Sequence, residues 1–427
     1  MPTPALEPAP LHVAIIGAGI TGVNLALGLQ ARGVSYTIYE RAPCFGEIGA
    51  GIGFSPNAER AMGLLNPEVL ASFKRIANPN GEDYFQWVDG HESGSLIFKL
   101  HVGKDGFQGG RRSDILEAWA NLIPPSSVRF SKELDTVTDG HPLTLHFKDG
   151  TTAHADAVIG CDGIRSRTRS LLPPSTPPAK PTYTRKFCFR ALAPLPLAIA
   201  TIGTPAATTR FMYNGPGAHV ITYPVANNTL LNILAVLSDP SPAWPHPTHT
   251  HASPTHKHEL VTFFRDWHPT VRGIASLFPD DEMLDKWAIF DLAERPVPAY
   301  SAGRVCVAGD AAHATGPHLG AGGGMGVEDA LCLAVLLAEV GRRVQRGEKR
   351  GVLVERALTV YHAVRYERTQ GVVRATREAV DLFQWRDEEV GRDPVRFGRE
   401  IEGMFRAVWE YDVEGMVREA VELMRDL

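Results

Sequence analysis

The chain has 427 residues, of which 44% are hydrophobic, and its 43 basic and 48 acidic side chains give a formal net charge of −5. A chain of this length can fill two closely joined domains with a substantial core. The near balance of charge excludes an extended basic surface, so we expect no nucleic-acid partner. No apolar run approaches the roughly 18 residues of a membrane span, so we expect none.

The N-terminal segment and the cysteines indicate a cytoplasmic protein. Residues 1–10 are Pro-rich and lack the basic start and long apolar core of a signal peptide. The cysteines are dispersed and form no CxxC pair, as is typical of reduced thiols. They are Cys44, Cys161, Cys188, Cys306 and Cys332.

The first predicted strand, residues 11–16, leads into a glycine-rich turn that runs Gly17-Ala18-Gly19-Ile20-Thr21-Gly22. Gly17 permits a tight turn, Gly19 lets the backbone approach a pyrophosphate, and Gly22 allows close packing of helix on strand. The phosphate would lie at the N-terminus of the new helix. We therefore expect Gly17, Gly19, Ile20, Thr21 and Gly22 to bind a dinucleotide.

The second predicted strand, residues 36–39, ends at Glu40, eighteen positions beyond Gly22. An acidic residue at this distance accepts hydrogen bonds from an adenosine ribose. The alternative is a tight strand–helix–strand turn that matches the motif by accident.

Two more short segments follow predicted strands. Cys161-Asp162-Gly163 comes after residues 157–160, and Gly309-Asp310-Ala311-Ala312-His313 comes after residues 305–308. In an open α/β sheet, ligands bind outside the carboxyl ends of the strands. Three such turns in order predict one long cofactor lying across the sheet.

Taken together, these motifs resemble those of the single-component FAD-dependent aromatic hydroxylases, in particular the salicylate hydroxylase-like branch. The resemblance also rests on Gly49-Ala50-Gly51-Ile52-Gly53, on Arg111-Arg112-Ser113-Asp114 and on the glycine-rich stretch 309–330, and it spans residues 11 to about 420. It implies FAD as the cofactor and NAD(P)H as the electron donor.

The resemblance also assigns residues to the cofactor. It places Asp162 and Gly163 at both FAD and NAD(P)H, Asp310 at the ribityl chain, and Arg112 in contact with the cofactor. It places the following residues there as well: Arg41, Gly53, Pro317, Gly320, Gly322, Gly323 and Gly324. The run 322–324 removes side chains where backbone must lie against a flat ring, and a helix beginning near Gly326 would stabilise reduced flavin.

The alternation of predicted elements divides the chain into four parts. Strands and helices alternate over 11–181, the first part of a Rossmann-like FAD-binding domain. Short alternating strands, such as 220–223 and 230–234, predict an inserted, mainly antiparallel sheet over 182–299 that forms a substrate domain. The FAD-binding domain resumes over 300–350, and 351–427 forms a C-terminal helical region. The fold class is α/β.

Several polar residues are interpreted as structural. The histidine-rich tract 240–258 predicts an exposed loop, and we expect no metal site. The arginines of the late helix, Arg365, Arg368, Arg374 and Arg377, predict a solvated face. Glu328 and Asp329 are placed in the first turns of a helix, where they favour its macrodipole. His313 is expected to shape the cofactor site rather than to transfer a proton.

Substrate activation is predicted at Arg190 and Tyr223, which match positions where relatives hold a phenolate with an arginine and a tyrosine. Oxygen transfer needs an electron-rich phenolate, and a nearby guanidinium lowers the pKa of a phenol. The alternatives are an interdomain ion pair for Arg190 and a core position for Tyr223.

The resemblance implies a monooxygenase that uses NAD(P)H and O₂ to hydroxylate a phenolic or aromatic carboxylic substrate through a flavin C4a-hydroperoxide. Conversion of salicylate to catechol is one such reaction. Hydroxylation of a larger phenol, including a dearomatising one, a flavin oxidase or dehydrogenase, and a flavin-binding redox sensor are the alternatives. Arg111, Leu319 and the pair Met325-Gly326 depart from the commoner family residues, so the substrate stays open.

Overall fold

The strands that precede the three glycine-rich turns lie side by side in one six-stranded sheet. The computed structural model describes residues 10–46, 51–103, 106–245, 251–279 and 283–426. The sheet has the order β18-β19-β11-β1-β2-β7, and all neighbours are parallel except β18 and β19. Its strands are β1 (His12–Ile16), β2 (Ser35–Tyr39), β7 (Val128–Arg129), β11 (Ala157–Gly160), β18 (Ser301–Ala302) and β19 (Val305–Val307). The three predicted strands are confirmed.

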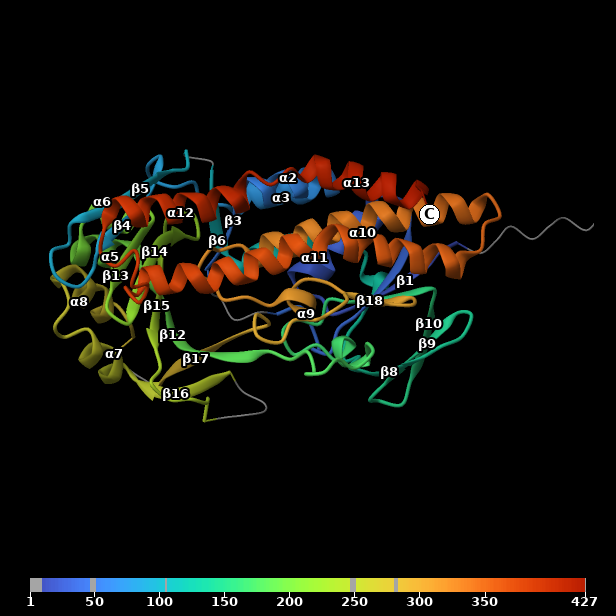
Figure 1. The fold of residues 1–427 in the computed structure, drawn as a ribbon, viewed down its shortest axis with the longest axis horizontal. Coiled ribbons are helices and arrows are strands. Elements are labelled where there is room, and N and C mark those ends of the chain that lie inside the picture. Colours follow the sequence, from blue (N-terminus) through green and yellow to red (C-terminus); the bar gives the residue numbers. More distant parts are fainter. Residues whose placement is uncertain (1–9, 47–50, 104–105, 246–250, 280–282, 427) are drawn as a thin grey trace, which may run out of the picture.

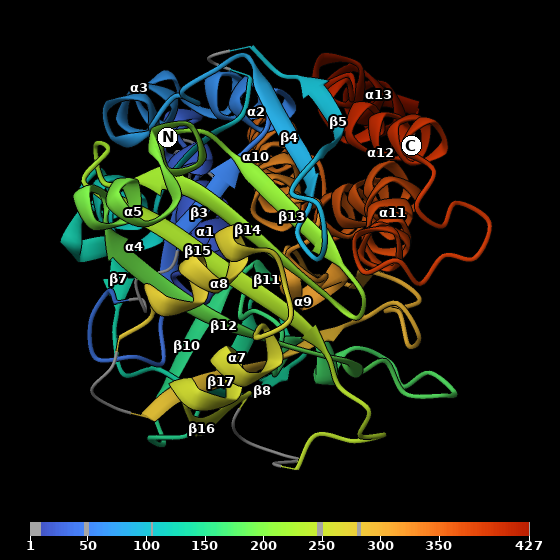
Figure 2. The ribbon, with the colours of Figure 1, turned by 90° about the vertical axis from the view of Figure 1, so that its left-hand side faces the viewer.

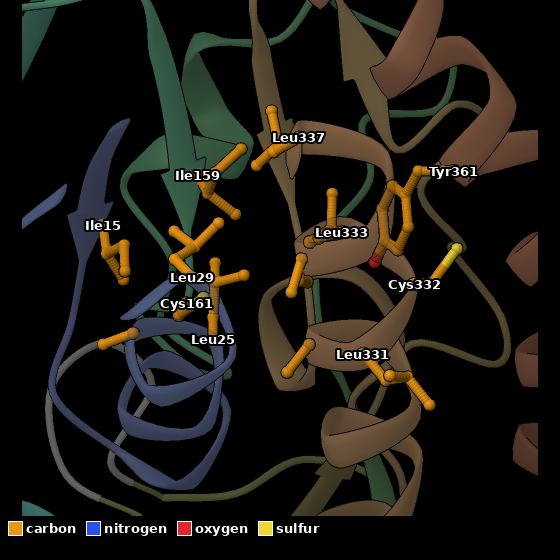
Figure 3. Packing of buried hydrophobic residues seen from close by; sticks show 14 of the residues in the cluster. Ile15, Leu25, Leu29, Ile159, Cys161, Leu331, Cys332, Leu333, Leu337 and Tyr361 are labelled. Carbon is orange, nitrogen blue, oxygen red and sulfur yellow. The ribbon is translucent and has the colours of Figure 1, made fainter. Parts of the chain in front are cut away.

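Both faces of this sheet are covered, which explains why its central strands are apolar throughout. Val13 and Ile15 of β1 join the core formed with α1 (Ile20–Ala31) and α10 (Gly322–Gln345). Figure 3 shows Leu25 and Leu29 of α1 between the strands and α10. The alternate residues of β1 pack against a three-stranded sheet of β8 (Leu134–Thr138), β9 (Leu143–Phe147) and β10 (Thr152–Ala155).

A second sheet has eight strands in the order β16-β17-β12-β15-β14-β13-β4-β5. Six of them come from the predicted insertion: β12 (Thr182–Pro194), β13 (Phe211–Gly215), β14 (Ala218–Val225), β15 (Leu230–Ser238), β16 (Ala252–His256) and β17 (Met283–Asp291). The other two, β4 (Tyr84–Asp89) and β5 (Leu96–His101), come from within 11–181, and β4 is parallel to β13. All other neighbours are antiparallel, so the mainly antiparallel sheet is confirmed.

The two faces of the second sheet differ in what covers them. One face is apolar and packs against α5 (Leu195–Ile202), α7 (Lys257–Phe263) and α8 (Pro269–Ser276). Figure 2 shows α7 and α8 in front of the strands. The other face turns toward the interior of the molecule, where Trp87 and Met212 pack with Phe383 of α11 (Arg350–Phe383) and Phe405 of α12 (Pro394–Trp409).

Helix α11 connects the two halves of the molecule. It is 34 residues long and contacts β18 of the first sheet and β13 of the second. Figure 1 shows α10, α11, α12 and α13 (Val413–Asp426) lying along the long axis. Leu358, Tyr361 and Val364 are buried and lie on the apolar face of this helix. In the described part of the chain, no helix is long and apolar enough to cross a membrane.

The remaining elements fill the space between these layers. They are β3 (Gly51–Phe54), β6 (Gln108–Arg111), α2 (Pro56–Leu65), α3 (Pro67–Ile76), α4 (Arg112–Ala120), α6 (Thr204–Thr208), α9 (Asp310–His313) and the short 3-10 helices Pro125–Ser127 and Thr168–Leu171. Strands β3 and β6 pair as a small antiparallel ribbon.

Candidate active site

A cavity of about 370 Å³ lies at the carboxyl ends of β1, β2 and β11. This is the edge at which an open α/β sheet binds ligands. Its lining includes seven of the residues predicted to bind the cofactor: Gly17, Gly19, Glu40, Arg41, Arg112, Asp162 and Gly163.

The first glycine turn is tightly packed at two positions and open at the third. Gly17 has φ +100°, and a Cβ there would lie 2.5 Å from the carbonyl oxygen of Cys161, while a Cβ on Gly22 would overlap the carbonyl oxygen of Gly17. In front of Gly19, which caps α1, no described atom lies within 4 Å of a Cβ position. A helix N-terminus with open space before it fits the pyrophosphate of FAD.

Glu40 ties the end of β2 to this turn. Its carboxylate accepts hydrogen bonds from the backbone N–H of Ala18 at 2.7 Å and of Ala42 at 2.8 Å. A carboxylate has about four lone-pair directions, so both oxygens can still accept from ribose hydroxyls. The geometry suits the predicted role.

Asp162 shapes the second turn. Its carboxylate accepts from Ser166 Oγ at 2.6 Å, from the N–H of Thr168 at 2.9 Å and from Thr168 Oγ1 at 3.1 Å. The neighbouring Gly163 has φ +73°, and nothing lies within 4 Å of its Cβ position. The turn therefore presents bare backbone to the cavity, held in place by the aspartate.

The second and third turns are joined by Arg169. This arginine, 9% exposed, donates to the carbonyl of Ile164 at 2.7 Å and to that of Ala311 at 3.0 Å. At the third turn, Asp310 is exposed, and its carboxylate makes no hydrogen bond to any residue the structure describes. Its carboxylate is thus available to a ligand at this edge of the sheet.

A fully buried ionic cluster holds the third turn from behind. Asp329 Oδ2 lies 2.6 Å from His313 Nε2 and accepts from the N–H of Gly309 at 2.9 Å. Its Oδ1 accepts from Arg365 Nε at 2.8 Å, and Arg365 Nη2 lies 2.6 Å from Glu328 Oε2. Burial raises the pKa of Asp329, but His313 and Arg365 outweigh it and hold the pKa below its usual value.

This cluster corrects two interpretations. Helix α10 begins at Gly322 rather than near Gly326, so Glu328 and Asp329 lie beyond its first turn, where they pair with Arg365 instead of complementing the macrodipole. The prediction of a solvated arginine face is wrong for three of the four arginines. Arg365 pairs with Asp329, Arg368 lies 3.4 Å from Glu328, and Arg377 pairs with Asp291. Arg374 is exposed, as predicted. Two acids within an apolar helix signal buried partners, because buried charges are usually paired.

The glycine-rich loop before α10 packs on the interior side of the second sheet, where Leu319 and Ala321 share a core with Trp87. Gly320 has φ +62°, and its N–H donates to the carbonyl of Pro317 at 3.0 Å. A Cβ on Gly323 would lie 3.0 Å from Ile52 of β3, and one on Gly324 would lie 3.0 Å from Ala58 of α2. These glycines let α10 pack closely on β3 and α2; their predicted contact with a flat ring remains a prediction, as does that of Gly322.

Gly53 and Thr21 are placed by close packing. A Cβ on Gly53 would overlap the ring of Phe107, which also lies 3.0 Å from the Cβ position of Gly320. Thr21 Oγ1 occupies the space beside both Gly309 and Gly326, so α1, the third turn and α10 meet there. Gly53 and Gly320, which come from distant segments, therefore lie on the same ring, and Thr21 lies at the third turn.

Arg190 and Tyr223 lie on one face of the second sheet. Arg190 pairs in register with Leu234, and Tyr223 pairs with Asn232, two residues away on the same strand, so both side chains point to the same side. Tyr223 Oη lies 2.7 Å from the Cβ position of Gly51, whose N–H donates to Asn232 Oδ1 at 2.9 Å. This is the face that meets β3.

The electrostatic surroundings of the two residues differ. The guanidinium of Arg190 is exposed and lies 5.2 Å from the ring centre of Trp287. It forms no ion pair with any residue in the described ranges, which weakens the alternative of an interdomain ion pair. Burial raises the pKa of the Tyr223 hydroxyl, whereas Arg210 and Arg190 act to lower it.

Sequence reasoning missed two polar residues near this face, Asn232 and Arg210. Asn232 interrupts the apolar run of β15, which is a signal because a buried amide needs a partner. Arg210, directly before β13, is buried beside Tyr223, and its sequence neighbours give no such signal.

The predicted loop is wrong for the end of the histidine-rich tract, where residues 252–256 form β16 and Lys257 begins α7. Residues 246–250 of the histidine-rich tract lie outside the described residues, while His251 stacks on Phe290 with ring centres 4.5 Å apart. Within the described ranges, no three His, Cys, Asp or Glu side chains gather as metal ligands would. The cysteines are free thiols, and all but Cys44 are buried.

Comparison with known proteins agrees with the fold and the cavity. The family described as FAD binding domain matches residues 10–376. The chain is 46% identical to the FAD-dependent monooxygenase orf3 of Aspergillus niger, over 97% of this chain and 96% of that protein. It is 40% identical to the salicylate hydroxylase asL1 of Sarocladium schorii, over 96% and 90% of the two chains.

A solved salicylate hydroxylase–substrate complex has a TM-score of 0.83 to this structure, with 29% identity over 96% of this chain and 98% of that one. The fold is that of a flavoprotein monooxygenase. The chain belongs to the FAD binding domain family, as an FAD-dependent monooxygenase of the salicylate hydroxylase-like branch.

Proposed function

We propose that the protein uses NAD(P)H and O₂ to hydroxylate a phenolic or aromatic carboxylic substrate. The observation that carries this proposal is the position of Arg190 and Tyr223 on the sheet face that meets Gly51 of β3. Phe107 packs on Gly320 of the loop that contains Pro317, and the guanidinium of Arg210 lies over the rings of both Phe107 and Tyr223. A phenol there would be bound between the second sheet and the loop predicted to hold the cofactor.

Different residues of the chain would bind the cofactor and the substrate. Glu40, Asp310 and the three turns would hold FAD, which, once reduced by NAD(P)H, would supply the activation of O₂. Arg190 would lower the pKa of the substrate hydroxyl, and Tyr223 would donate a hydrogen bond to the resulting phenolate oxygen. Phe85, Trp87 and Met212 exclude water from the adjacent core.

The names of two similar proteins support salicylate as one candidate substrate. Attack at the carbon that bears the carboxyl group would release CO₂ and give catechol. A larger phenol fits the same roles of Arg190 and Tyr223, so the proposal covers both.

Oxidation of NADH and of NADPH by the purified protein, with and without each of a set of simple phenols, tests this function. We expect one or more phenols to stimulate oxidation, O₂ to be consumed, and the product to carry one additional oxygen atom or, from salicylate, to be catechol. Oxidation that no phenol changes, or that yields no oxygenated product, would instead support an oxidase, a dehydrogenase or a redox sensor.

A further inference from the structure

Arg210 is a buried cation that has no acidic partner among the described residues. It is 4% exposed, and its guanidinium carbon lies 4.0 Å from the ring centre of Phe107, 5.1 Å from that of Tyr223 and 5.7 Å from that of Phe85. The guanidinium donates one hydrogen bond, from Nη1 to the carbonyl oxygen of Phe107 at 3.2 Å. Its Nε is buried with no hydrogen-bond partner, and no carboxylate in the described chain lies within ion-pair distance.

Two other buried arginines of this chain are neutralised by carboxylates, whereas Arg169 is held by two backbone carbonyls. Arg365 pairs with Glu328 and Asp329, and Arg304, 5% exposed, lies 2.7 Å from Asp139. A buried unpaired charge is costly, and the faces of aromatic rings compensate for it only in part. Burial lowers the pKa of Arg210 to about 10, so the guanidinium still carries its charge at neutral pH.

The neighbours of Arg210 indicate which kind of ligand neutralises its charge. Phe107, on which the guanidinium stacks, lies against both Gly53 and Gly320, and Tyr223 lies against Gly51. Two arginines act to lower the pKa of the Tyr223 hydroxyl: Arg210, which is buried, and Arg190, which is exposed. Arg210 thus lies at the inner end of the face on which Arg190 and Tyr223 are proposed to bind the substrate.

A guanidinium has five N–H donors in a planar fork that matches two oxygens of a carboxylate. Arg210 uses one of them within the protein. Phe85 and Phe107 add apolar surface beside the remaining donors, which suits an aromatic anion better than an inorganic one.

We propose that Arg210 binds an anionic oxygen of the aromatic substrate, in addition to the hydroxyl group that Arg190 and Tyr223 hold. The enzyme then selects aromatic compounds that carry a second acidic oxygen, a carboxylate or a second phenolate. This inference rests on the proposed function, because it places the substrate on the same face.

The test compares anionic and neutral probes of the same shape. The FAD-loaded protein is titrated with salicylate and with salicylamide, and with 2,4-dihydroxybenzoate and its carboxamide, while the flavin absorbance is followed. We expect the wild type to bind at least one acid about tenfold or more tightly than its amide, as a charged hydrogen-bonded pair provides. Arg210→Gln should bring this ratio close to one by weakening the acid alone, and Arg210→Lys should retain part of it.

Arg374→Gln is the matched control, because Arg374 is exposed on α11. It should leave the ratio unchanged. Thermal unfolding without probe adds a second readout: Arg210→Met should melt no lower than the wild type, since it removes an unpaired buried charge.

Two results would overturn the inference: a wild type that prefers neither acid, or an Arg210→Gln protein that keeps the wild-type ratio, whether its FAD affinity is retained or lost. Loss of FAD affinity with the ratio kept would mean that Arg210 balances the charge of the cofactor. Because the titration needs neither NAD(P)H nor O₂, its outcome is independent of whether any phenol stimulates oxidation. Failure of the inference is therefore distinguishable from failure of the proposed function.

Discussion

Three acidic residues at the cofactor edge, Glu40, Asp162 and Asp310, differ in what they already bind. The carboxylates of Glu40 and Asp162 accept hydrogen bonds from the protein's own backbone and hydroxyl groups, so they stabilise the turns that carry them. Asp310 makes no such bond within the described chain and is exposed. Replacing the Asp310 side chain should therefore change the stability of the fold little, so the effect of a substitution on FAD binding can be measured without a change in folding.

We predict that Asp310→Ala weakens FAD binding by about 1.5–3 kcal/mol, because a hydroxyl of the cofactor loses a charged partner. Titration of apo-protein with FAD measures this loss. The melting temperature of the apo-protein should stay within error of the wild type. An unchanged FAD affinity would remove Asp310 from the site, and a large drop in apo-protein stability would show that its role is structural.

At the scale of elements, the buried cluster joins α9, α10 and α11 behind the third turn. Arg365 is the link, since it contacts both acids of α10, and its removal leaves two buried carboxylates short of a cation. The glycine turn depends on the same cluster through the bond from Gly309 to Asp329. Helix packing and the position of the third turn are therefore coupled.

We predict that Arg365→Met destabilises the protein by about 3–5 kcal/mol, the usual cost of breaking a buried ion pair on one side. Chemical denaturation of the variant and of Arg374→Met, the exposed control on the same helix, measures the difference. The control should change stability by no more than about 0.5 kcal/mol. Equal stability of the two variants would contradict the structural role given to the cluster.

The sequence could predict those features that depend on interactions between residues close together along the chain. The glycine turns and Glu40 depend on neighbours within one strand–helix–strand unit, so spacing alone was enough to place them together. The partners of Asp329 lie 16 and 36 residues away on other helices, and helical periodicity carries no information about them. Strands β4 and β5 were missed as members of the second sheet for the same reason, because the hairpin that they form joins this sheet through the pairing of β4 with β13, which spans more than a hundred residues.

At the scale of the whole molecule, the two sheets carry separate tasks. The six-stranded sheet presents the cavity that fits FAD, and the eight-stranded sheet carries Arg190 and Tyr223 on the face that meets β3, with Arg210 beside Tyr223. Neither Arg190 nor Tyr223 lines the cavity at the first sheet. A change at these two residues should therefore affect the substrate without releasing the cofactor.

The amount of product formed per NAD(P)H oxidised, measured in protein of known FAD content, tests this account most directly. We predict that Arg190→Lys and Tyr223→Phe keep wild-type FAD content but form less product per NAD(P)H, because the phenolate is held less well and lysine lacks the planar fork of arginine. If both variants turn over a phenol with the rate and coupling of the wild type, the substrate is not activated on this face of the second sheet, and the central claim is wrong.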